Sequence, residues 1–286
     1  LPKSAKEMPN VNYTPREKQR KDLMPIEVSQ PRGPSFKITD GNRVSWLGWD
    51  FQVGWNMREG LSLNLMTLQS RTLFHKLSVV EMVVPYGDPA KPHCYKAAFD
   101  AGEDGFGRNA NSLKLGCDCL GHIEYLNGCM TDGNCAYSLD NAICIHEEDA
   151  GIAWKHTDWR TEEAQVRRGR RLVVSFITTI ANYDYGFYWH LYLDGKVELE
   201  VKLTGVLSTG LYSHEDNSSR AYGQNLGNSL YAPIHQHFFC ARIDPVIDGP
   251  QNSCVENNVT VGPSPGSDDT NPLGNAFYYT STMLES

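Results

Sequence analysis

The feature that most constrains the fold is a pair of β-forming runs joined by a turn dipeptide. The two runs read FYWHLYL at 187–193 and KVELEVKLT at 196–204. Asp194-Gly195 lies between them, and this dipeptide between alternating apolar runs is the strongest short-range signal for a β-hairpin. The chain is therefore expected to contain at least two long antiparallel strands in one sheet.

Other parts of the chain repeat this pattern of β-forming residues. Period-two alternation predicts strands at 43–55, 61–69 and 73–84. Shorter candidates lie at 121–126 and 141–146, and LVVSFITTI at 172–180 is apolar enough to be buried on both faces. Helical periodicity is scarce, and no repeat of fixed length is present. The predicted fold class is all-β, an antiparallel β-sandwich.

Three segments differ from these runs in composition. Residues 1–40 carry six prolines and are expected to form an extended linker with at most one short helix, because proline fixes φ and lacks a donor. The domain then spans 41–286. The Gly/Asn/Ser-rich stretch 209–233 is too long for an idle loop and is expected to be either a mobile excursion or an arm that orders against a partner. Residues 248–275 are interpreted as loop, and the acidic HEEDAG at 146–151 as a solvated turn.

The charge balance and the apolar content exclude two classes of protein. The chain has 26 basic and 34 acidic residues, a net charge of −8, whereas a nucleic-acid binder presents a basic face. No run of about twenty apolar residues is available to span a membrane. The first residues, LPKSAKEMPN, lack an initiator Met and an apolar signal core, so the chain is interpreted as part of a longer protein whose compartment the sequence does not indicate.

The cysteines favour a disulfide over a zinc site. Eight are present, and four lie close together, at Cys117, Cys119, Cys129 and Cys135. Their spacing lacks the paired C-x2-C hooks of zinc ribbons, so one structural disulfide somewhere among the eight is the expectation.

Two histidines and one aspartate are candidates for chemistry. His235 and His237 are two residues apart before a predicted strand, so both imidazoles can reach one point and bind copper or zinc. The alternative is a polar strand edge. No histidine follows His237 in the sequence, so a third histidine ligand would come from upstream or from outside this chain. Asp100, in KAAFDAGEDG, is either a turn cap or a proton acceptor.

Several motifs together resemble one family. Residues 179–184 read T-x-x-N-Y-D, and the HxH pair follows about fifty residues later. This combination resembles the copper-containing amine oxidases, whose tyrosine in that motif becomes topaquinone. The resemblance runs from about residue 22 to 250 and includes, in the family's order, SVVEMVVPYGDP (78–89), NSLKLGCDC (111–119), AICIHEEDAGI (142–152), WKHTDWR (154–160) and HQHFFCARID (235–244).

The resemblance implies a copper and quinone centre. Tyr183 would be the topaquinone precursor, oxidised by copper and dioxygen without a second enzyme. Asn182 and Asp184 would hold its ring in orientation. His235 and His237 would be two of the three copper ligands. The family's third histidine lies far downstream, so residues 1–286, with a catalytic sandwich incomplete at the C-terminus, are expected to be inactive alone.

Further roles follow from the same resemblance. Asp100 would be the catalytic base and Tyr86 would hydrogen-bond a quinone oxygen. Cys119 and Cys144 would form the disulfide. A peripheral calcium site is also found in the family, but here only Asp244 of Asp244-Pro245-Val246 fits its acidic pattern.

The implied activity is oxidation of primary amines to aldehydes, with dioxygen as oxidant and hydrogen peroxide and ammonia as products. The resemblance also implies a homodimer, with 209–233 as the arm that reaches the second subunit. Family members occur both in peroxisomes and outside cells. The alternative is a non-catalytic β-sandwich module that acts through binding or dimerisation.

Overall fold

A computed structural model describes residues 20–211, 222–227, 229–265 and 270–284. One group of strands comprises β1 (Phe36–Thr39), β2 (Arg43–Trp46), β3 (Trp49–Asn56), β4 (Gly60–Leu68), β5 (Arg71–Pro85), β6 (Ala97–Phe99) and β15 (Phe238–Pro245). A second group comprises β7 (Ile123–Thr131), β8 (Ala136–Thr157), β9 (Ala164–Ile180), β10 (Tyr183–Tyr192) and β11 (Val197–Gly205). The short strands are β12 (Gly210–Leu211), β13 (Gly223–Gly227), β14 (Leu230–Pro233), β16 (Val255–Val261) and β17 (Phe277–Met283). The described residues also contain two single-turn helices, η3 (His93–Tyr95) and α1 (Asp100–Glu103).

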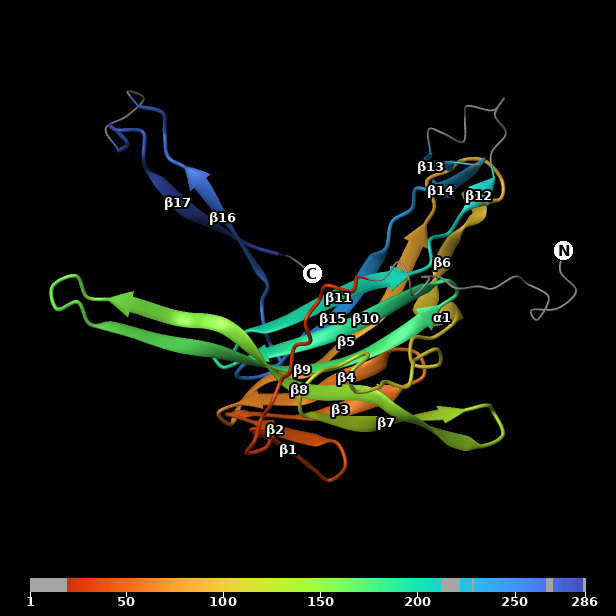
Figure 1. The fold of residues 1–286 in the computed structure, drawn as a ribbon. Helices are drawn as coiled ribbons and strands as arrows, with labels where there is room; N and C mark the ends of the chain where they lie inside the picture. Colours follow the sequence, from red (N-terminus) through yellow and green to blue (C-terminus); the bar gives the residue numbers. More distant parts are fainter. Residues whose placement is uncertain (1–19, 212–221, 228, 266–269, 285–286) are drawn as a thin grey trace, which may run out of the picture.

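These strands form two main antiparallel sheets (Figure 1). The larger has seven strands in the order β1-β2-β3-β4-β5-β15, with β6 also paired to β5. The second has five in the order β11-β10-β9-β8-β7. The predicted all-β antiparallel sandwich is confirmed. Within the described residues, no helix has the length and apolar character needed to cross a bilayer.

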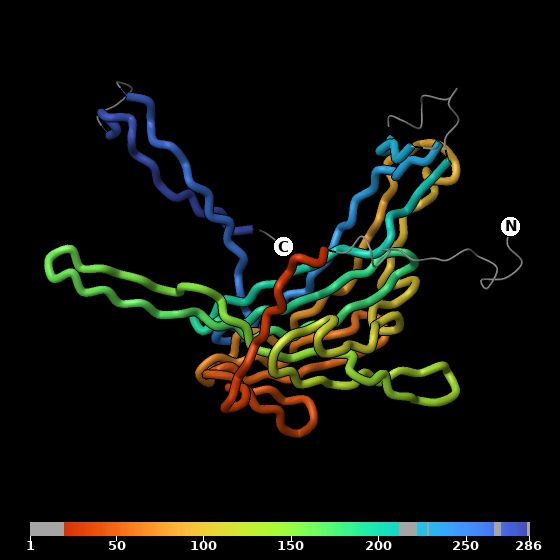
Figure 2. The backbone as a smooth tube through the Cα atoms, in the orientation of Figure 1, coloured from red at the N-terminus to blue at the C-terminus, as the bar shows by residue number. Residues whose placement is uncertain are grey.

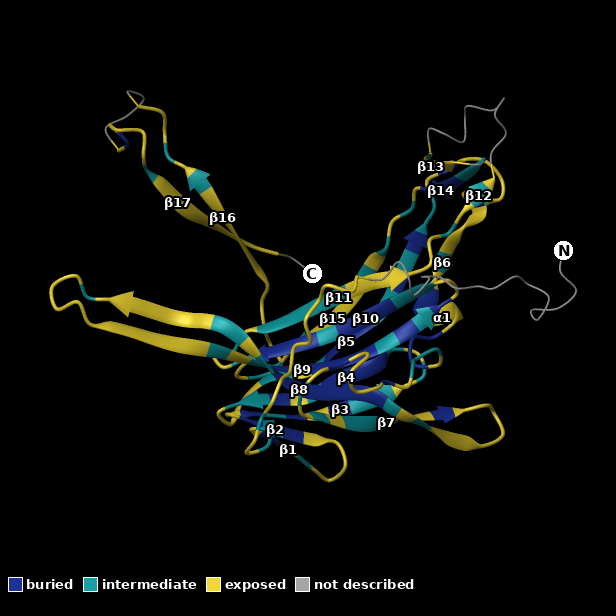
Figure 3. Ribbon diagram, in the orientation of Figure 1, coloured by how far each residue is buried: buried dark blue, intermediate teal, exposed yellow. Residues whose placement is uncertain are grey.

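The core lies between the two sheets (Figure 3). Trp55 of β3 meets Phe176 of β9 edge to face, with ring centroids 5.7 Å apart. Residues 172–176 of β9 are all buried, as their continuous apolar character predicted. Alternate residues of β9, among them Leu172, Val174 and Phe176, face this core, while Ile177 packs against a smaller cluster that contains Cys119.

The predicted hairpin at Asp194-Gly195 joins β10 to β11, with Leu191 opposite Val197. Its loop is one residue longer than expected, since the Tyr192 N–H donates to the Lys196 carbonyl at 2.9 Å. Three residues therefore lie between the paired ends, and Gly195 takes a left-handed φ of 92°. Glycine at this position is typical of three-residue hairpin loops.

The run 43–55 forms two strands instead of one. Leu47 and Gly48 both have positive φ, 45° and 98°, and they make the turn between β2 and β3. A type I′ turn needs positive φ at both central positions. The apolar alternation hides this turn, because Leu47 is an unusual residue for it.

The prediction that the acidic stretch 146–151 forms a solvated turn is wrong. The stretch lies within β8. The side chain of Glu147 is only 2% exposed. Its carboxylate accepts hydrogen bonds from Gln30 Nε2 at 2.7 Å, the Ser35 N–H at 2.7 Å and Trp46 Nε1 at 2.8 Å. Glu147 therefore ties the N-terminal segment and β2 to the second sheet.

The three atypical segments contain more strand than expected. β1 lies inside the segment expected to be linker and pairs with β2, so strand structure begins before residue 40; residues 1–19 lie outside the described part. β16 lies inside 248–275, which corrects the expectation of loop there. Of the expected arm at 209–233, residues 212–221 and 228 lie outside the described residues, and the rest forms the sheet β12-β14-β13. The far part of the β8–β9 hairpin projects from the sandwich (Figure 2).

Candidate active site

Tyr183 opens β10 directly after a tight turn. It pairs with Ile180 across the β9–β10 hairpin, so Ala181 and Asn182 form a two-residue turn, and Ala181 has a φ of 54°. Asn182 Nδ2 donates to the Val206 carbonyl at 2.5 Å. These contacts tie the turn to the chain that follows β11 and fix the backbone from which the Tyr183 ring projects.

Asp184 follows Tyr183 and is also held in place. Its Oδ1 accepts a hydrogen bond from Thr179 Oγ1 at 2.5 Å. Thr179 Oγ1 is also bonded by Asn111 Nδ2 at 2.9 Å. The polar residues of the T-x-x-N-Y-D motif thus stabilise the hairpin end around the tyrosine, while the Tyr183 ring itself is left facing a cavity.

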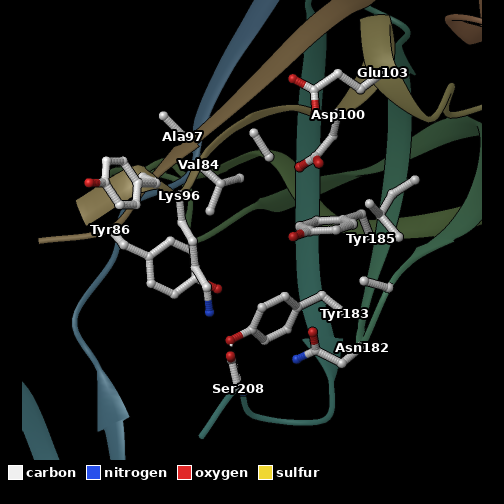
Figure 4. Close-up of a pocket in the computed structure, with 14 residues that line it drawn as sticks. Val84, Tyr86, Lys96, Ala97, Asp100, Glu103, Asn182, Tyr183, Tyr185 and Ser208 are labelled. Carbon is white, nitrogen blue, oxygen red and sulfur yellow. Dashed lines mark hydrogen bonds between the residues drawn. The ribbon is translucent and has the colours of Figure 1, made fainter. Parts of the chain in front are cut away.

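This cavity has a volume of about 440 Å³ and is shown in Figure 4. Its walls come from the end of β5, from β6 and α1, and from the β9–β10 turn. The polar or aromatic side chains that line it are Tyr86, Tyr95, Lys96, Asp100, Glu103, Asn182, Tyr183, Tyr185 and Ser208. A small organic molecule can enter a space of this size.

Asp100 is the first residue of α1 and is 6% exposed. Burial, together with the nearby carboxylates of Asp104, Glu103 and Glu81, raises the pKa of its carboxyl to about 6. Within the described residues, no hydrogen bond to this carboxylate is formed. A buried carboxylate with a raised pKa that faces a cavity is suited to accept a proton at neutral pH.

Tyr86 lies just beyond β5 and lines the same cavity. Its ring stacks on that of His235 with centroids 4.6 Å apart. Burial raises the pKa of Tyr86, while a hydrogen bond to the Ser208 side chain lowers it. The Tyr183 hydroxyl accepts a hydrogen bond from the Ser208 N–H at 3.1 Å. Ser208 thus contacts both phenols.

The structure places His235 and His237 against Tyr183. Each imidazole centroid lies 5.6 Å from the tyrosine ring, and the two imidazoles lie 4.9 Å apart. Both precede β15, and His235 forms a single β-bridge with Tyr86. Burial lowers the pKa of His237 and so does neighbouring His235, which favours the neutral imidazole that binds metals.

The donor chemistry of this pair fits a copper site in part. Two imidazoles in contact with the Tyr183 ring are suitable ligands for copper. Across the described ranges, no group of three or more His, Cys, Asp or Glu side chains is placed to hold a metal ion. The two histidines are therefore a partial ligand set.

The expected disulfide is not formed in this structure. Cys119 and Cys144 are both buried free thiols, and they hydrogen-bond to each other. This contact lowers the pKa of Cys119 and raises that of Cys144. Cys117, like the other remaining cysteines, is exposed and free.

Asp244, the one acid that fits the family's calcium pattern, lies in β15. Its carboxylate contacts His75 Nδ1 at 3.2 Å and Arg242 at 3.2 Å. Asp244 therefore forms an ion pair with Arg242, and in the part of the chain described no group of three or more His, Cys, Asp or Glu side chains is placed to hold a metal ion.

Sequence reasoning missed two residues that line the cavity, Ser208 and Tyr185, and a buried pair near it, Asp88 and Tyr231, which connects to Tyr86 through the ring of His93. Asp88 is 2% exposed and accepts hydrogen bonds from the Tyr231 hydroxyl at 3.0 Å and the Ala90 N–H at 2.8 Å. Burial raises the pKa of Tyr231 to about 12, as does its bond to Asp88. Tyr185 carried a usable signal, because it is two residues after Tyr183 in a strand and so shares its face.

With this geometry established, comparison with known proteins identifies the class. The family described as copper amine oxidase, enzyme domain, matches residues 37–286. The chain belongs to the copper amine oxidase family.

Particular relatives support this assignment. The chain is 50% identical over 285 residues to histamine oxidase from Arthrobacter globiformis, covering 96% of this chain and 40% of that protein. It is 49% identical over 289 residues to peroxisomal N-methylputrescine oxidase 1 from Nicotiana tabacum, covering 96% and 36%. The structure of a copper-containing benzylamine oxidase from Hansenula polymorpha superposes with a TM-score of 0.85 at 37% identity, covering 93% and 41%. The chain thus spans less than half the length of these relatives.

Proposed function

We propose that the protein oxidises primary amines to aldehydes with dioxygen and releases ammonia and hydrogen peroxide. The observation that carries this proposal is the placement of Tyr183: its ring lines one cavity with the buried carboxylate of Asp100, and the imidazoles of His235 and His237 lie against the same ring. Family membership supports amine oxidation as the reaction class.

The proposed copper ligands in this chain are His235 and His237, and the proposed quinone precursor is Tyr183. A quinone derived from this side chain supplies an electrophilic carbonyl and an electron sink, and copper with dioxygen supplies the oxidising power that forms it. Asn182 and Asp184 hold the hairpin end on which Tyr183 sits.

Asp100 is the proposed general base. It accepts the proton from the substrate carbon next to the amino group, a step that positioned carboxylates accelerate by about 10²–10⁴-fold. A carboxyl with a pKa of about 6 is mostly ionised at neutral pH and can therefore take up this proton. The N–H of Ser208 orients the oxygen of residue 183 at the opposite end of the ring, and Tyr86, which lines the same cavity, is the proposed hydrogen-bond partner of the quinone oxygen.

The experiment compares the copper-loaded full-length protein with its Tyr183→Phe variant. Peroxide formation from benzylamine and from putrescine is measured in air. The wild type is expected to produce peroxide with at least one amine, and the variant none. Tyr188→Phe is the matched control, because Tyr188 lies on the same strand but is directed away from the cavity, under Lys202. Peroxide production by Tyr183→Phe at the wild-type rate would refute the proposal.

We also propose that Cys119 and Cys144 become linked when the protein is oxidised. Their thiols are in contact; when the S–S bond forms, the two S–H bonds break, and an oxidant such as dioxygen takes up the two protons and two electrons. A disulfide that closes a loop of this length, roughly 25 residues, stabilises the fold by about 3 kcal/mol in the loop-entropy model. Peptide mapping with and without reductant tests the pairing, and a different partner for either cysteine would contradict it.

A homodimer is the proposed assembly. The β8–β9 hairpin extends away from the sandwich with its tryptophans uncovered, and Trp159 is 85% exposed. Apolar side chains of this size gathered on a projecting element favour a protein partner. Light scattering of the full-length protein tests the assembly, and a monomer at micromolar concentration would contradict it.

A further inference from the structure

The two imidazoles beside Tyr183 are held through the same ring nitrogen by different groups. Nδ1 of His235 lies 2.8 Å from the backbone carbonyl of Pro233. Nδ1 of His237 lies 3.1 Å from the hydroxyl of Tyr185. In both rings Nε2 is therefore the nitrogen left without a protein partner among the described residues.

Tyr185 is placed rigidly enough to act on His237. It is 2% exposed and lies in β10 opposite Thr178 of β9. Its ring packs edge to face on Phe239 at 6.2 Å and on Tyr183 at 6.4 Å. With its ring confined on both sides, the hydroxyl has a fixed position next to His237.

The two contacts differ in what they impose on the imidazole. A carbonyl oxygen only accepts, so Pro233 requires a proton on Nδ1 of His235 and leaves the Nε2 lone pair free. A hydroxyl accepts or donates, so Tyr185 holds the ring of His237 and stabilises the tautomer whose Nδ1–H it accepts. A neutral imidazole binds metal through the nitrogen that carries no proton, and the hydrogen bond at the other nitrogen decides which one that is.

We propose that Tyr185 is a positioning residue for the metal ligand His237: its hydroxyl accepts the Nδ1–H, so that His237, like His235, presents Nε2 to the metal. This inference rests on the proposed function in one respect, that the pair holds copper. Tyr185 would then couple the strand that carries Tyr183 to the metal ligands, because both tyrosines project from the same face of β10.

The first test is the affinity of the full-length, copper-depleted protein for Cu(II), measured by competition with a chelator. Tyr185→Phe keeps the ring and its packing but removes the hydroxyl. We expect copper to bind about 10–100-fold more weakly, the usual effect of losing such an outer hydrogen bond to a metal-binding histidine. Tyr188→Phe, at the other face of β10, is expected to bind as the wild type does. Equal affinity of Tyr185→Phe and wild type would overturn the proposal.

The second test reads the tautomer directly and needs no variant of Tyr185. Nitrogen NMR of copper-free protein labelled at histidine, with the signal of His237 assigned from a His237→Gln variant, is expected to show the proton on Nδ1. A proton on Nε2 would overturn the proposal even if Tyr185→Phe fails to fold. The outcomes also separate the two proposals: a wild type that binds no copper contradicts the proposed function, whereas copper binding that is insensitive to Tyr185 contradicts only this inference.

Discussion

Replacing Asp100 with asparagine is predicted to change how the stability of the protein depends on pH. Burial raises the pKa of this carboxyl from 3.8 to about 6. One pKa unit corresponds to about 1.4 kcal/mol, so ionising Asp100 in the folded state costs about 3 kcal/mol more than in the unfolded chain. The side chain is 6% exposed, so solvent screens little of this cost.

The sign of the effect follows from linkage. Because the folded-state pKa is the higher one, the folded protein binds the proton more tightly than the unfolded chain. The contribution of Asp100 to stability is therefore fully present below about pH 4, and it is lost as the pH rises through about 6. Asparagine carries no charge to bury, so Asp100→Asn should gain up to about 3 kcal/mol relative to wild type between pH 4 and pH 8.

The assay is urea unfolding of the full-length wild type and variant across this pH range. The quantity to compare is the difference between their free energies of unfolding at each pH. Asp40→Asn is the control, because Asp40 is an exposed carboxylate in the turn after β1 and is not among the groups that shift the pKa of Asp100. The reasoning that burial of Asp100 raises its pKa would be refuted by one result. That result is a difference between the free energies of unfolding of wild type and Asp100→Asn that stays constant from pH 4 to pH 8.

Three further predictions concern the same residues and two buried contacts. The kcat/KM of the copper-loaded enzyme for benzylamine should rise as the pH increases through about 6, where Asp100 ionises; a profile that is flat from pH 5 to pH 7 would contradict its role as base. Glu147→Ala should destabilise the protein by about 3–5 kcal/mol in urea unfolding, because it leaves buried donors such as Trp46 Nε1 without an acceptor. A loss below about 1 kcal/mol would show that the hydrogen bonds of Glu147 do not hold the N-terminal segment and β2 to the second sheet. Tyr231→Phe should lower the free energy of unfolding by about 1–3 kcal/mol, because it leaves the Asp88 carboxylate buried with one partner fewer. The double variant Asp88→Asn, Tyr231→Phe should lose less of this free energy than the sum of the two single losses. Additive losses would rule out the direct bond.

The sheets could be predicted from the sequence because their signals are local. The apolar run at 172–180 and the Asp194-Gly195 turn each follow from a few adjacent residues. Glu147 could not be predicted in the same way. Its burial depends on Gln30, Ser35 and Trp46, which lie more than a hundred residues away in the chain, and an acidic cluster has no local pattern that distinguishes a solvated turn from a buried acceptor.

The candidate site was predictable where it rests on short motifs. Tyr183 and the pair His235 and His237 are marked by their spacing, and the structure brings them to within ring contact. Ser208 and Asp88 carry no such sequence signal. Ser208 acts through its backbone N–H, which bonds to Tyr183, and Asp88 accepts a hydrogen bond from Tyr231, which is distant in sequence. Contacts of this kind appear only when the sheets have been assembled.

The central claim is that the phenol at position 183 is chemically converted beside the histidine pair. Mass spectrometry of the peptide that contains Tyr183, from full-length protein loaded with copper in air, tests it most directly. The account predicts an oxidised side chain at 183 that forms an adduct with phenylhydrazine. An unmodified tyrosine at this position, in protein shown to contain copper, would contradict the account.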